Sequence, residues 1–170
     1  MAAGNTYTPI ATYTFTNSTT ASYTFSSIPG TYTDLVLVVT GGVTSQYSPT
    51  LQINSDTGAN YSVNWVRGNG SATSASRANA STAATNYFTF SPSGMEATLN
   101  GTFTTHFMNY ANTTTYKTYL TRNSSANIEA GAYAGLWAST AAITQLVVGA
   151  QSPQYWVSGT TMALYGILAA

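Results

Sequence analysis

The chain has 170 residues, of which four are Lys or Arg and four are Asp or Glu, so its formal net charge is zero. Free cytosolic enzymes usually carry about a quarter charged residues, so the composition argues against that class. No basic stripe is present to neutralise phosphates, and we expect no nucleic-acid partner. A protein without net charge repels its own copies weakly, so we expect a homo-oligomer.

The length suits one domain that spans residues 1–170 and has a sizeable core. The chain has no cysteine, which excludes disulfides and thiolate metal sites. Its longest apolar run, Leu35–Val39, is far shorter than the roughly 20 residues of a membrane helix, so we expect no membrane partner. The first residues lack the basic and apolar regions of a secretory signal, and we expect synthesis in the cytoplasm.

The expected elements are all β-strands, because apolar side chains either alternate with small polar ones or form short β-branched runs. In chain order they cover residues 10–15, 23–25, 34–40, 51–53, 62–66, 87–90, 97–103, 106–110, 116–120, 130–137, 143–148 and 162–167. Glycine-rich and proline-rich turns separate them. Short strands with regular turns predict an all-β fold, an antiparallel β-sandwich, for which a jelly roll is the expected arrangement.

Two segments carry further expectations. Residues 70–85 contain no large apolar side chain and are predicted to form a long loop, either a mobile surface excursion or an arm ordered by a neighbouring subunit or receptor. Gly166 interrupts the last apolar strand, which indicates a bulge or a close backbone approach. That strand is expected to lie inside the fold.

Asp56-Thr57-Gly58 copies the tripeptide of aspartic proteases, which pair two such aspartates. A single copy with no apolar strand leading into it is explained more simply by a turn between residues 51–53 and 61–63. A calcium site at Asp56 remains an alternative.

Other catalytic constellations are weak. The sole histidine, His106, would need Asp34, Asp56, Glu96 or Glu129 to build a triad, and its alternating context fits a strand residue facing solvent or an interface. Glu96 and Glu129 as a glycosidase pair lack a distinctive context. We therefore expect no enzyme activity, no catalytic residue, no cofactor and no metal.

Aromatic residues are more numerous than one core needs, with 13 Tyr, 6 Phe and 3 Trp. Tyr and Trp anchor protein interfaces and stack on sugars. The candidate interface or glycan contacts are Trp65 and Arg67, which precede a glycine turn, and Tyr155 and Trp156, which lie in a loop-like stretch. Core packing is the alternative for both tryptophans and for Tyr155.

Four segments in order resemble small β-rich virion structural proteins of tailed bacteriophages, many from phages of aquatic bacteria including cyanobacteria: Ile28–Leu37, Asn54–Ser62, Gly135–Thr144 and Gly159–Ile167. The resemblance implies a non-enzymatic structural component of the virion exterior. We expect a homotrimer that decorates the head or forms a short head fibre, with the major capsid protein as partner. The alternative is a tail-fibre or receptor-binding module that recognises host surface glycan.

Overall fold

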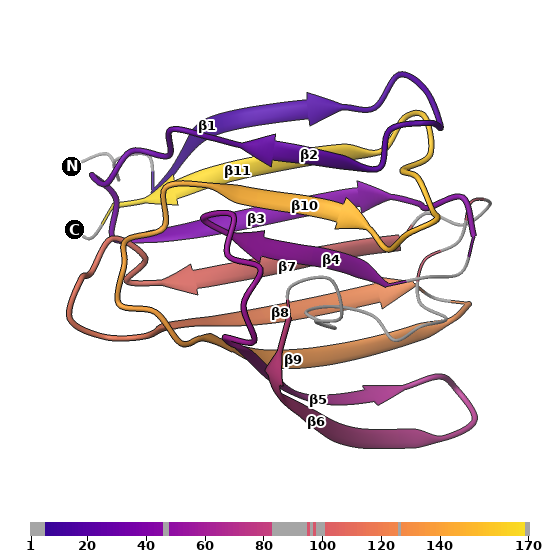
Figure 1. The fold of residues 1–170 in the computed structure, drawn as a ribbon. Helices are drawn as coiled ribbons and strands as arrows, with labels where there is room; N and C mark the ends of the chain where they lie inside the picture. The colour runs from indigo at the N-terminus through magenta and orange to yellow at the C-terminus, as the bar shows by residue number, and fades with distance from the viewer. Residues whose placement is uncertain are drawn as a thin grey trace, which may run out of the picture.

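The computed structural model describes residues 6–45, 48–82, 95, 97, 101–125 and 127–168. These form an antiparallel β-sandwich (Figure 1), which confirms the expected fold class. The eleven strands are β1 (Tyr7–Thr14), β2 (Ser22–Phe25), β3 (Asp34–Gly41), β4 (Pro49–Ile53), β5 (Tyr61–Gly68), β6 (Thr73–Ser81), β7 (Gly101–Met108), β8 (Lys117–Ser125), β9 (Glu129–Trp137), β10 (Leu146–Ala150) and β11 (Thr161–Ile167).

The strands divide unequally between the two sheets. The large sheet has eight strands in the order β1-β11-β3-β7-β8-β9-β5-β6, and the small sheet has three in the order β2-β10-β4. An eight-stranded jelly roll instead consists of two Greek keys folded into two sheets. The three strands of the small sheet face only part of the inner side of the large sheet, and among the described residues no second sheet covers its outer side.

Side-chain alternation explains how the sheets pack. Burial alternates without a break along β8, from buried Lys117 to buried Ser125, as expected for a strand with one face on the core. The inward side chains of both sheets form one apolar core that includes Leu37, Leu51 and Phe103. The even-numbered residues of β7, β8 and β9 point to the opposite, outer face of the large sheet.

The last strand is internal, as expected, because β11 lies between β1 and β3. Gly166 in this strand marks a close approach. A Cβ atom at Gly166 would lie 2.2 Å from Cγ of Tyr32, so the tyrosine ring lies directly against the glycine backbone. Only a residue without a side chain fits beneath this ring.

Several expected strands have different boundaries. Residues 97–103 and 106–110 were predicted as two strands, but β7 is one continuous strand whose Thr104 and Thr105 both pair with β3. The run at 143–148 becomes a strand only at Leu146, because the amide of Ile143 bonds instead to the carbonyl of Tyr110 in a neighbouring loop. Residues 130–137 lie within β9, which confirms the strand expected there. The strand expected at 87–90 lies outside the described residues.

The prediction of a long loop at 70–85 is wrong for most of that segment. Residues 73–81 form β6, an edge strand hydrogen-bonded to β5, and residues 83–85 lie outside the described residues. The hairpin turn explains the difference: Asn69 Oδ1 accepts the amides of Ser71 and Ala72, and Gly70 has a φ of 85°. Backbone pairing at a sheet edge stabilises a strand that has no large apolar side chain to bury.

Candidate functional site

A shallow groove crosses the outer face of the large sheet. Its volume is about 650 Å³, and it joins a neighbouring hollow of about 360 Å³ with which it shares Asn64, Leu120 and Ala134. Volumes in this range are typical of small-ligand sites. We call the two together the outer groove; its exposed floor and walls come from β7, β8, β9, β5 and β6.

The register of the strands places the groove residues in two adjacent rows. One row runs across the strands through His106, Leu120, Ala134, Asn64 and Arg77. The next row runs through Thr104, Arg122, Ala132, Val66 and Ala75. The small alanines of β9 therefore lie at the centre, with larger side chains on both sides.

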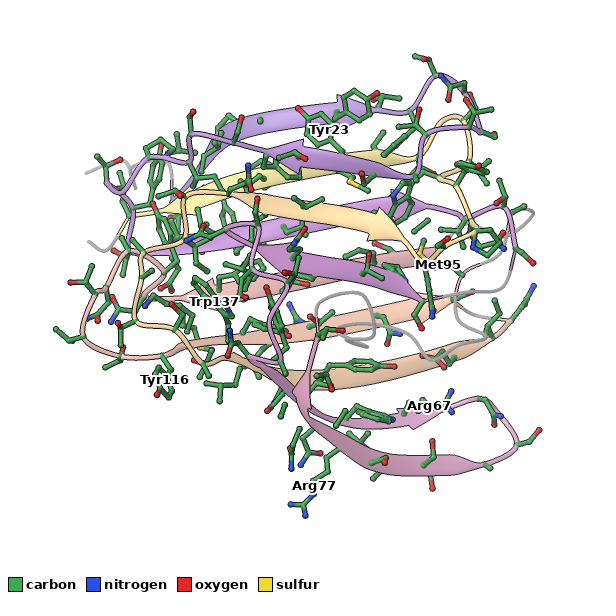
Figure 2. The ribbon with its side chains drawn as sticks, viewed as in Figure 1. Tyr23, Arg67, Arg77, Met95, Tyr116 and Trp137 are labelled. Carbon is green, nitrogen blue, oxygen red and sulfur yellow. The ribbon has the colours of Figure 1, made fainter. Side chains whose placement is uncertain are left out.

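The groove combines apolar surface with positive charge. Val66 and Leu120 are 55% and 49% exposed, which is unusual for large aliphatic residues of a sheet. Arg77 and Arg122 are exposed, and within the described part of the chain neither makes an ion pair or hydrogen bond. In Figure 2, Arg77 extends from β6 away from the body of the sandwich.

His106 lies at the β7 side of the groove and is held by a carboxylate. Its Nε2 atom is 2.9 Å from Oδ2 of Asp34, whose Oδ1 accepts the backbone amide of Asn109 at 2.7 Å. Two of the residues weighed for a triad thus lie together. His106 is a residue of strand β7, as expected, and its side chain is 40% exposed.

Arg67 takes part in a buried polar network on the inner face. Its guanidinium donates to Oε2 of Glu129 at 2.7 Å, and Oε1 of Glu129 accepts bonds from Asn123 and the Tyr133 hydroxyl. Burial, and next the negative charge of Glu129, raises the pKa of Tyr133. The half-buried ring of Trp65 stacks on Tyr133 with centroids 6.4 Å apart. Trp65 and Arg67, which were candidate contacts, therefore lie on the inner face of the large sheet.

The adjacent candidates Tyr155 and Trp156 have opposite environments. Tyr155 is 40% exposed, whereas Trp156 is fully buried and its ring stacks on Phe15 at 5.8 Å. Trp156 is therefore a core residue, and the prediction that it contacts a partner or a glycan is wrong. The amide of Trp156 bonds to the carbonyl of Thr20.

Asp56 lies in the predicted turn between β4 and β5. Its carboxylate accepts the Gly58 amide, the Asn60 side chain and the indole N–H of Trp137. The Trp137 hydrogen bond lowers the pKa of Asp56. These bonds explain the Asp-Thr-Gly sequence as a turn that is fastened to the core.

Lys117 is a buried cation that the sequence analysis did not single out. Its ammonium donates to the carbonyls of Thr115 and Thr140, and burial lowers its pKa. Both partners are backbone atoms of loops, so Lys117 fastens two chain segments together.

The remaining candidates do not form a reactive site in the described residues. Glu96, the partner required for a glycosidase pair, lies outside them. Among the residues that are described, no three His, Asp or Glu side chains gather closely enough to hold a metal ion. The same part of the chain has no helix with the length and hydropathy needed to cross a membrane.

Comparison with known proteins gives no relative. No protein-family model, curated protein or solved structure matches this chain. The sequence analysis missed the outer-groove residues Val66, Leu120, Arg122, Ala132 and Ala134. For the four apolar residues the available signal was an aliphatic residue or alanine at a position where an alternating strand normally has a polar side chain.

Proposed function

We propose that this chain is a non-enzymatic structural protein on the exterior of a tailed-phage particle. Its copies associate as a homotrimer and attach to the head beside the major capsid protein, as decoration or a short head fibre. The scarcity of charge and the resemblance of four segments to virion proteins support this proposal. A chain with so few charged groups suits packing against many neighbours.

The observation that carries the proposal is an exposed apolar cluster on β1 and β11, formed by the rings of Tyr7 and Tyr165, with the exposed Leu168 directly after β11. Tyr7 and Leu168 are 55% and 50% exposed, and the rings of Tyr7 and Tyr165 meet edge to face at 6.2 Å. Exposed aromatic and aliphatic groups of this kind mark protein contacts. The adjoining β1 edge contains Pro9 and a bulge, so the contact is expected through side chains rather than by strand addition.

The stoichiometry of the protein in purified virions, measured by quantitative mass spectrometry against the major capsid protein, tests this function. Hundreds of copies per particle support head decoration. A few dozen or fewer move it to a tail or vertex appendage, and none refutes the virion assignment. The Tyr7→Ser variant is expected to be incorporated poorly, whereas Tyr116→Ser, which removes an equally exposed tyrosine from a loop, serves as the matched control.

A second candidate is a tail-fibre or receptor-binding module that recognises host surface glycan. The outer groove favours it, because the groove lies on β5 to β9, away from the Tyr7 cluster on β1 and β11. The register places Tyr165 in the same cross-strand row as Val36 and His106, so attachment and recognition would use opposite ends of one face of the large sheet.

A further inference from the structure

We infer that the outer groove binds an acidic glycan, a saccharide chain that carries carboxylate groups. This inference rests on the second candidate function, recognition of glycan, and names the ligand class and the residues that select it. The charge of the groove, its apolar floor and the hydrogen bonding of its backbone support this inference.

The positive charge of the outer groove favours an anionic ligand. Arg77 and Arg122 both face the outer groove, and neither has a partner in the described part of the chain. Asp34, a described carboxylate on the same face, already bonds His106 and the Asn109 amide. Guanidinium groups bind carboxylates through two parallel hydrogen bonds, so two unpaired arginines on one face favour a ligand with several carboxylates.

The positions of the arginines favour an elongated ligand. Arg122 is on β8 and Arg77 on β6, which is three strands further along the sheet. Neighbouring strands lie about 4.8 Å apart, so the two Cα atoms are separated by roughly 15 Å. A chain of repeating acidic units can present a separate carboxylate to each arginine across that distance.

A second copy of this protein does not satisfy the same charges. Asp56 is bonded to Trp137, Asn60 and Gly58, and Glu129 is buried beside Arg67. The Glu129 side chain is 1% exposed and cannot reach a neighbour's arginine, and most of the acceptor capacity of Asp34 and Asp56 is already used within the chain. Charge complementarity among the described residues therefore points to a foreign partner.

The floor of the groove favours a saccharide over a peptide. Asn64 and Ala134, at its centre, belong to strands paired on both sides, so their backbone groups are used within the sheet and cannot add a peptide strand. Ala132 and Ala134 leave a shallow apolar surface between Val66 and Leu120 on which the C–H face of a sugar ring can lie. Asn64 and Thr104 supply amide and hydroxyl groups for sugar hydroxyls.

Isothermal titration of the purified full chain with hexagalacturonate, an alginate hexamer and a sialic acid hexamer tests the inference, with maltohexaose as the neutral comparison and hexaglutamate as the acidic peptide. We expect at least one acidic saccharide to bind at least tenfold more tightly than maltohexaose and hexaglutamate, and its affinity to fall with salt. No binding by all three acidic saccharides, or equal binding of hexaglutamate, overturns the inference.

Variants locate the binding. Arg122→Gln and Arg77→Gln are each expected to weaken it about tenfold, as loss of a charge-assisted bond does. Ala134→Glu places a repelling charge on the exposed floor and should abolish binding, whereas Ala138→Glu, which adds the same charge at an exposed position outside the groove lining, should change it less than threefold. Unchanged binding in Ala134→Glu, with the fold checked by circular dichroism, overturns the assignment. Virion stoichiometry is measured separately, so failure of glycan binding and failure of the virion proposal are distinguishable.

Discussion

The indole N–H of Trp137 donates a hydrogen bond to Oδ2 of Asp56 at 2.7 Å, and this bond joins the β4–β5 turn to the end of β9. The two residues are 81 positions apart. Trp137 is a core residue, 3% exposed, and Figure 2 shows it inside the sandwich, whereas Asp56 belongs to a surface turn. A charged group at the surface is thus held by a donor from the core.

Asp56→Ala is expected to lower the free energy of unfolding by about 1 kcal/mol, because it removes a charged acceptor from Trp137, Asn60 and Gly58 at a partly solvated site. The folded-state pKa of Asp56 lies below 3.8, so its contribution is present above that pH and is lost as the pH falls through the folded value. Urea denaturation at pH 7 and pH 2 measures this. The wild type should lose more stability on acidification than Asp56→Asn; equal losses would contradict the role of the carboxylate.

Gly166→Ala is expected to destabilise the fold by about 2 kcal/mol, because its Cβ would lie 2.2 Å from Cγ of Tyr32 and the ring would have to move. Gly68→Ala is the matched control. It adds the same methyl group to another strand, where the nearest atom is 3.9 Å away, and should change stability by less than about 0.5 kcal/mol. Thermal unfolding of both variants measures the difference, and equal effects would show that the Tyr32 ring yields without cost.

Much of the architecture follows from local pattern, because a strand with one buried face repeats every two residues wherever it lies in the sheet. That rule locates β8 in the sequence, whereas a continuous apolar run locates β3. The rule misses β6, whose stability comes from pairing with β5 and not from its own side chains. The assignment of strands to sheets of eight and three depends on contacts between distant segments, so pattern alone does not reveal it.

The candidate site is harder to predict than the fold for a related reason. Trp156 and Tyr155 are neighbours with similar chemistry, yet one is buried and the other exposed, which the loop conformation decides. The outer groove is made of ordinary side chains such as Ala134 and Leu120, and they become a surface feature only when β5 to β9 lie side by side. The register of the strands likewise places Arg77 of β6 and Arg122 of β8 on one face of the large sheet.

Trp156→Ala is expected to cost about 4 kcal/mol of stability, because it empties a large, fully buried site against Phe15. Tyr155→Ala removes a side chain that is 40% exposed and should cost less than about 0.5 kcal/mol. Chemical denaturation monitored by circular dichroism compares the pair. A small loss for Trp156→Ala would show that the tryptophan is less well packed than its burial indicates, and would return it to the candidate contacts.

Arg67→Met is expected to lower the free energy of unfolding by about 2 kcal/mol, because it leaves the Glu129 carboxylate, 1% exposed, without the guanidinium that lies 2.7 Å away. The cost is reduced from that of a fully buried pair because the Arg67 side chain is 27% exposed. Glu129→Gln in the Arg67→Met background should recover part of the loss, since it removes the uncompensated charge. Urea denaturation of both single variants and the double variant forms a mutant cycle. Additive losses would mean that Arg67 and Glu129 contribute independently, and that the packing of the arginine stem against the inner face accounts for its effect.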